Sequence, residues 1–178
     1  MNEKVLSDDL TVAASHVQTL ITQDKTSNLK KEARVGLNYY NYRHDILDNR
    51  IFYVDENGRL KEDQYASNVK IPHPFFTELV DQKVQYLLSN PVEFETDDDA
   101  LKDYLKEYVD DDLQVALQDV AQGASIKGSE FIYARTTSED KLKFEAADSL
   151  QMIPVYDDNN ELVALIRYYE RDITKDGK

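Results

Sequence analysis

The sequence has no cysteine and no tryptophan, and it has only 5 glycines and 4 prolines among 178 residues. Without cysteine there is no disulfide framework, no thiolate nucleophile and no zinc site with cysteine ligands. So few glycines and prolines exclude a fibrous or low-complexity chain. No apolar run approaches the ~18 residues of a membrane-spanning helix, and the N-terminus MNEKVLSDDL lacks the layout of a signal peptide. We therefore expect no membrane partner.

Positive charge is also scarce. Lysine and arginine number 21 against 35 aspartates and glutamates, which gives a net charge of −14, while 41% hydrophobic residues indicate a globular chain. Residues 24–50 hold six basic and four acidic side chains, and residues 95–112 hold two basic and nine acidic ones. An acidic surface without a strong basic cluster repels phosphate backbones, so a module that grips DNA or RNA is excluded.

The first 127 residues carry helical periodicity. Asp8 or Asp9 is a candidate N-cap for the first helix, Ser27 for the second, and Pro74 is placed in the first turn of a third helix that runs to about Ser89. Two more helices are expected over residues 98–109 and 111–127, closed by Gly128. The helical part is thus predicted over residues 8–127.

Strand signals come mainly afterwards. Residues 51–54 and the turn Asp55-Glu56-Asn57-Gly58 predict an early hairpin, and residues 92–94 predict a brief strand. The strand-rich part is expected over residues 130–173. Its strands are predicted at residues 131–133, 142–144, 152–156 and 162–173. Helices followed by a mainly antiparallel sheet define an α+β fold.

Candidate chemistry is sparse. The three histidines (His16, His44 and His73) lack metal-ligand spacing, and no glycine-rich phosphate loop or nucleophile elbow is present. The triplets at residues 97–99 and 110–112 offer carboxylates for Mg²⁺ or Ca²⁺, but both lie at predicted helix starts, where aspartate caps free N–H groups. We favour capping and assign no catalytic, cofactor-binding or metal-binding residue. The 12 tyrosines suit either half-buried core edges or protein–protein contacts, and the sequence does not separate the two.

Four segments, in order, resemble landmarks of the portal proteins of tailed bacteriophages, of the type found in siphoviruses of Gram-positive hosts and their prophages. They are YYNYRHDIL at residues 39–47, NVKIPHPFF at 68–76, LVDQKVQYLLSNPV at 79–92 and DSLQMIPVYD at 148–157. The matching positions are Tyr39, Tyr40, His44 and Ile46; Asn68, Ile71, Pro74 and Phe75; Lys83, Tyr86, Leu87 and Pro91; Pro154, Tyr156 and Asp157.

The resemblance implies a structural, non-enzymatic subunit of a ring, usually dodecameric, at one capsid vertex. It implies a conduit through which DNA is packaged and ejected without sequence-specific binding, and a head-to-tail connection point. The implied partners are other copies of the chain, terminase, capsid or scaffold proteins and head-completion proteins. The implied location is the virion, with assembly in the host bacterial cytoplasm. No cofactor is implied.

Residues 1–178 resemble the N-terminal wing portion of such proteins, and the stem, clip, tunnel loop and crown are absent. The Asp176-Gly177 turn signal, which predicts a returning strand, also favours an N-terminal part of a longer chain. In the wing, the helix after Pro74 is expected to lie under the sheet, so that Leu87→Asp should unfold the domain.

Two other functions stay open from the residues. One is an acidic, phage-derived interaction module, either a head–tail adaptor or a nucleic-acid mimic, supported by the acidic block at residues 95–112. The other, more remote, is a carboxylate metal-dependent enzyme built on the two aspartate triplets.

Overall fold

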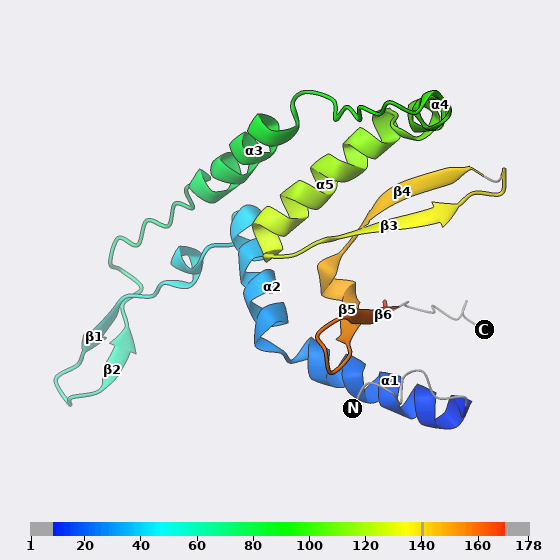
Figure 1. The fold of residues 1–178 in the computed structure, drawn as a ribbon. Helices are drawn as coiled ribbons and strands as arrows, with labels where there is room; N and C mark the ends of the chain where they lie inside the picture. Colours follow the sequence, from blue (N-terminus) through cyan, green and yellow to red (C-terminus); the bar gives the residue numbers. More distant parts are fainter. Residues whose placement is uncertain (1–8, 140, 170–178) are drawn as a thin grey trace, which may run out of the picture.

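The computed structural model describes residues 9–139 and 141–169, which form an α+β fold as predicted (Figure 1). The helices are α1 (Leu10–Lys25), α2 (Asn28–Tyr40), α3 (Phe75–Leu88), α4 (Asp99–Tyr108) and α5 (Asp111–Lys127), with 3₁₀ turns η2 (Asp45–Asp48) and η3 (Ser149–Gln151). The strands are β1 (Phe52–Val54), β2 (Leu60–Glu62), β3 (Phe131–Thr136), β4 (Leu142–Ala147), β5 (Met152–Tyr156) and β6 (Leu162–Arg167).

The predicted helix boundaries are confirmed by their caps. The side chain of Asp9 accepts hydrogen bonds from the first-turn amides of α1, and Ser27 does the same for α2. Gly128 ends α5 in the left-handed conformation with φ 86°, which glycine adopts without a steric penalty. Pro74 takes the N-cap position of α3, one residue earlier than the first-turn position predicted for it.

Helix α5 organises the packing. It lies between α3 and α2 on one side and the β3–β4 hairpin on the other (Figure 1). Gly36 permits the close approach of α2 and α5, because a Cβ atom at this position would lie 2.1 Å from the carbonyl oxygen of Ile126. The expectation that the third helix lies under a sheet is therefore wrong, since α3 packs against helices.

The strands pair as three separate two-stranded antiparallel sheets, in the order β1–β2, β3–β4 and β5–β6. The predicted strand over residues 92–94 is wrong. That segment is extended but has no ladder partner, and the Val92 amide instead donates to Oε1 of Gln114 at 3.1 Å. Pairing of the last strand ends at Arg167, and the predicted turn at Asp176-Gly177 lies outside the described residues.

The N-terminal helices close against the last strands through polar contacts. The Lys30 ammonium donates to the carbonyl oxygens of Ser149 and Met152, and it lies 3.3 Å from the Asp24 carboxylate. The Tyr168 hydroxyl donates to the same carboxylate at 3.0 Å. These contacts fix the junction between α1 and α2 on β5.

The buried apolar core is small for the length of the chain. Its members are Ala33, Val80, Ala116, Ala147, Met152, Ile153 and Val155. Among the described residues, thirty large hydrophobic side chains are, by contrast, at least 38% exposed. Much apolar surface is therefore left for contacts that this chain does not make with itself.

Candidate functional site

The first two sequence landmarks meet at one groove beyond the C-terminal end of α2. Tyr39, His44 and Ile46 line one part of it, and residues 69–76 supply the rest through Val69, Ile71, His73, Phe75 and Phe76. We call this the tyrosine–histidine groove; its volume is about 630 Å³. Two of these eight residues are histidines, and the other six are aliphatic or aromatic. The groove therefore suits an apolar occupant.

Tyr39 and His44 build one wall of the groove together. Their rings stack with centroids 4.7 Å apart, and Nε2 of His44 lies 3.0 Å from the Tyr39 carbonyl oxygen. The Tyr39 hydroxyl donates to the Asp45 carboxylate at 2.9 Å, and this hydrogen bond raises the pKa of Tyr39. The chain reverses at Tyr42, which has a left-handed φ of 60°. The segment YYNYRHDIL thus contains the end of α2 and the turn after it, which brings His44 back against Tyr39.

Tyr40 points the other way, into the contact between α2, α3 and α5. Its hydroxyl donates to the Asp81 carboxylate and accepts from the Gln122 amide, both at 2.8 Å. Its carbonyl oxygen accepts from the Thr77 hydroxyl at 2.8 Å. Burial and the Asp81 hydrogen bond together raise the pKa of Tyr40 to about 12. Adjacent motif tyrosines therefore serve two purposes, one in the groove and one in helix packing.

The NVKIPHPFF segment is fastened to the chain that follows the first motif. The Asn68 amide donates to the carbonyl oxygen of Asn49 at 2.9 Å, and the Lys70 ammonium donates to that of Leu47 at 2.7 Å. The His73 and Phe75 rings stack at 5.4 Å. Asn68, Ile71, Pro74 and Phe75 thus form one structural unit with Tyr39, His44 and Ile46.

The third motif does not reach the groove. Lys83, Tyr86 and Leu87 are exposed on the second half of α3, with Tyr86 88% and Leu87 57% exposed. Pro91 follows the end of the helix and lines a separate hollow beside α4. The buried residue of α3 is Val80, two turns before Leu87 on the same side of the helix.

The fourth motif also lies apart, on β5 and the turn after it. Pro154 is half-buried opposite Leu165, and Tyr156 is exposed next to a register shift. Asp157 shapes the turn to β6, because its carboxylate accepts from the amides of Asn159 and Glu161. None of these three positions lines the tyrosine–histidine groove.

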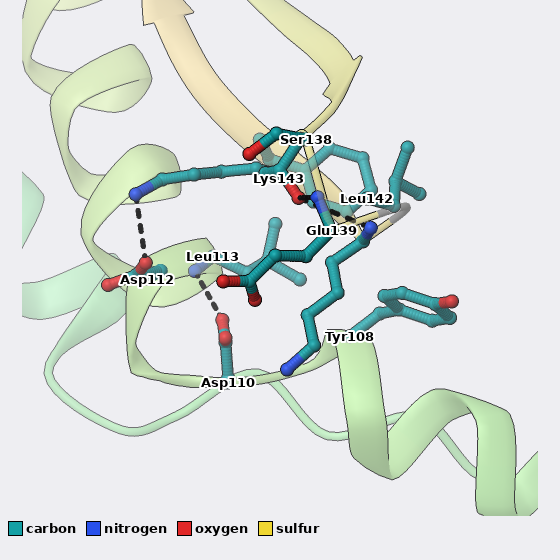
Figure 2. A pocket seen from close by; sticks show the side chains of 11 residues that line it. Tyr108, Asp110, Asp112, Leu113, Ser138, Glu139, Leu142 and Lys143 are labelled. Carbon is teal, nitrogen blue, oxygen red and sulfur yellow. Dashed lines mark hydrogen bonds and ion pairs between the residues drawn. The ribbon is translucent and has the colours of Figure 1, made fainter.

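One aspartate of each triplet caps a helix. The Asp98 carboxylate accepts from the amides of Ala100 and Leu101, and the Asp110 carboxylate accepts from that of Leu113. Figure 2 shows Asp110 and Asp112 in a pocket between α5 and the β3–β4 hairpin, where Asp112 pairs with Lys143 at 3.1 Å. Within residues 9–139 and 141–169, no three carboxylates or imidazoles are arranged to hold a metal ion.

Sequence reasoning missed a row of glutamines on α5. Gln114 donates to the carbonyl oxygens of Leu88 and Asn90, Gln118 donates to that of Leu88, and Gln122 donates to Tyr40. Their four-residue spacing places all three on one helix face, and that regularity is a signal the sequence carries. It also missed the burial of Lys30, because no adjacent residue in the sequence indicates that this side chain is buried.

Among the described helices, none combines the length and the apolar character needed to cross a membrane.

Comparison with known proteins gives one family. The family described as "Phage portal protein, SPP1 Gp6-like" matches residues 21–178. A portal protein of Bacillus phage SPP1 is 32% identical over 155 residues, which cover 86% of this chain and 30% of that protein. A portal protein of Clostridium phage phiCD119 is 25% identical over 148 residues, or 71% of this chain and 33% of that protein. The chain thus spans about a third of the length of these relatives.

Proposed function

Since the chain belongs to the SPP1 Gp6-like family of phage portal proteins, we propose that it forms the N-terminal wing portion of a portal ring subunit. The observation that carries this proposal is the family match over residues 21–178. The many exposed apolar side chains support it, because such side chains in a ring subunit can be buried by neighbouring subunits. A small buried core within one chain is consistent with that arrangement.

The proposed role of the ring is to conduct DNA into the capsid and out again. A conduit must not hold the duplex, and a chain of net charge −14 repels phosphates rather than binding them. The proposed partners are further copies of the chain, terminase, capsid or scaffold proteins and head-completion proteins. The proposed location is the capsid vertex, reached from the host bacterial cytoplasm during assembly.

The proposed role is structural rather than enzymatic. Each aspartate triplet, on which a metal-dependent alternative was based, contributes one helix cap, Asp98 at α4 and Asp110 at α5. The adaptor or nucleic-acid mimic alternative rests on the exposed carboxylates of residues 95–112 and has no support from the family match.

Native mass spectrometry with negative-stain electron microscopy of the complete gene product tests the proposal. We expect a closed ring with a central hole and a mass that is a whole multiple of the subunit mass. A stable monomer or dimer of the complete product would contradict it. In that case, capture of a basic protein partner would favour the adaptor or mimic.

A further inference from the structure

The β1–β2 hairpin has no core of its own. All six of its strand residues are exposed, and it stands away from the helices at one end of the molecule (Figure 1). A single two-stranded hairpin is at best marginally stable in water, so its faces need cover from elsewhere. No such cover comes from the described residues of the same chain.

One face of this hairpin is apolar. The register pairs Val54 with Leu60 and Phe52 with Glu62, and alternate residues of a strand share a face. Phe52, Val54 and Leu60 therefore lie together, exposed by 50, 63 and 68% respectively, beside Glu62, whose carboxylate pairs with Arg50 at 3.2 Å. We call these three residues the hairpin face. Tyr53 and Lys61 occupy the opposite face.

The tyrosine–histidine groove, between the hairpin and the body of the molecule, is its apolar counterpart. Val69, Ile71 and Phe75 line the groove and are 72, 59 and 65% exposed. Residues 64–77 include one formally charged side chain, Lys70, whose ammonium already donates to the carbonyl oxygen of Leu47. Residues 50–77 as a whole hold four basic and four acidic side chains, so the hairpin and this part of the groove carry no net formal charge on a strongly acidic chain.

The difference in charge between this surface and the rest of the chain indicates which partner binds here. Two copies of a chain with net charge −14 repel each other wherever their carboxylates are in excess, so copies associate most easily where the charges balance. A basic partner would instead be drawn to the acidic segment around α4 and would gain nothing from this surface. The charge pattern therefore favours a second copy of the chain.

Exposed apolar side chains lie on both sides of such a contact. The hairpin of one copy would supply Phe52, Val54 and Leu60, and the groove region of the next copy would supply Tyr65, Val69, Ile71 and Phe75; each is at least half exposed. Because the two sets belong to different partners, this contact alone is smaller than the ~800 Å² per partner of a standard interface. It would form one part of the boundary between neighbouring copies.

We propose that the hairpin face of one copy packs into the tyrosine–histidine groove of the next copy. The two surfaces differ, so the contact is heterologous, and repetition of a heterologous contact closes into a ring when the rotation permits. The inference rests on the proposed ring function and specifies the residues that join neighbouring subunits.

Disulfide trapping tests the contact, because the chain contains no cysteine of its own. A Val54→Cys protein is mixed with a Val69→Cys protein under mild oxidation at high micromolar concentration. Each protein has one cysteine, so every disulfide joins two molecules. Non-reducing gels and peptide mass spectrometry identify the pair. We expect the 54–69 disulfide to exceed, at least tenfold, the 53–69 disulfide of the matched control, in which Tyr53→Cys places the thiol on the opposite face.

Equal yields from the two mixtures would overturn the proposal, and so would the absence of any 54–69 disulfide. A dominant 54–54 disulfide would overturn it too, because it would indicate a two-fold contact between hairpin faces.

A second measurement separates this inference from the proposed function. In the complete gene product, Val54→Asp should reduce the ring fraction at least tenfold by native mass spectrometry, and Tyr53→Asp should not. Both positions are exposed, so thermal melting of each variant should match the parent. Normal rings from both variants would refute the contact and leave the ring function standing. A parent product without rings would refute the ring function, while the disulfide yields still decide the contact.

Discussion

Lys30 is a charged side chain that is only 7% exposed, and its environment explains how that is tolerated. An amine that leaves water must recover its hydrogen bonds. Lys30 does so through two carbonyl oxygens, of Ser149 and Met152, and through the Asp24 carboxylate. One side chain thus joins α2 to the turn before β5.

Replacement of Lys30 should be costly. Lys30→Met keeps most of the volume but leaves both carbonyls without the lysine donor and Asp24 without its ion-pair partner, so we expect the free energy of unfolding to fall by about 3 kcal/mol. Urea denaturation followed by circular dichroism measures it. Lys31→Met, an exposed neighbour on the same helix, is the control and should stay within about 0.5 kcal/mol of the parent. Equal losses for the two variants would contradict the assigned role of Lys30.

Tyr40 gives a pH-dependent test. Its pKa is raised to about 12 in the folded chain from an ordinary value of 10.0, so folding favours the protonated hydroxyl. The stabilisation is complete below about pH 10 and is lost as pH rises towards 12.

At pH 8, Tyr40→Phe should lower the free energy of unfolding by about 1–2 kcal/mol, because Asp81 and Gln122 lose their shared partner. Urea unfolding of both proteins at pH 8 and pH 11.5 should show this difference shrinking at the higher pH. A difference that does not change with pH would count against the Tyr40–Asp81 hydrogen bond.

At the scale of elements, two apolar residues on the same side of α3, two turns apart, differ in burial. Val80 is 5% exposed against neighbouring helices, whereas Leu87 is 57% exposed. We therefore expect Val80→Asp to unfold the chain by burying an unpaired carboxylate, and Leu87→Asp to leave its melting temperature nearly unchanged. Thermal melting by circular dichroism compares the two. Unfolding by Leu87→Asp would mean that the exposed Leu87 side chain is needed for the fold.

The glutamine row on α5 holds the end of α3 and the link that follows it. Gln114→Ala removes donors to Leu88 and Asn90 and the acceptor of the Val92 amide, so about 1–3 kcal/mol of stability should be lost. Hydrogen exchange should accelerate at residues 88–94. Asp119→Ala, an exposed change on the same helix, should leave that exchange unaltered.

Local elements were the predictable part of this fold. Asp9, Ser27, Asp98 and Asp110 cap helices through bonds to amides two or three residues away, and Gly128 ends α5 by its own backbone conformation. Such interactions join residues that are close together in the sequence, so a short segment is enough to predict them. The first two motifs were identified one by one along the chain, and nothing in their sequences indicated that they line a shared groove.

The unpredictable part depends on contacts between distant segments. Residues 92–94 have strand composition, but a strand needs a ladder partner, and the side chain of Gln114 meets the backbone there instead. Helical periodicity correctly predicted a helix after Pro74. Periodicity does not say which neighbouring element covers the apolar residues of that helix. Burial of Lys30 is invisible in sequence because its partners lie more than a hundred residues away.

For the whole molecule, net charge opposes assembly while the uncovered apolar surface favours it. Added salt shortens the screening length from ~30 Å at 0.01 M to ~8 Å at 0.15 M, which weakens repulsion between copies of a −14 chain. We expect self-association, followed by sedimentation velocity, to strengthen over this range. Weaker association at higher salt would indicate that copies attract through opposite charges rather than through apolar surface.

The partners of Lys30 also set an order of events during synthesis. The carbonyls that receive its ammonium belong to residues 119 and 122 positions later in the chain. At ~5–20 residues per second, a ribosome needs on the order of 6–25 s to add that stretch. Helix α2 therefore leaves the ribosome well before its docking surface exists, and its lysine stays hydrated until β5 has emerged. Strand β5 and the turn before it, translated long after α1 and α2, are thus what fastens these two helices in place.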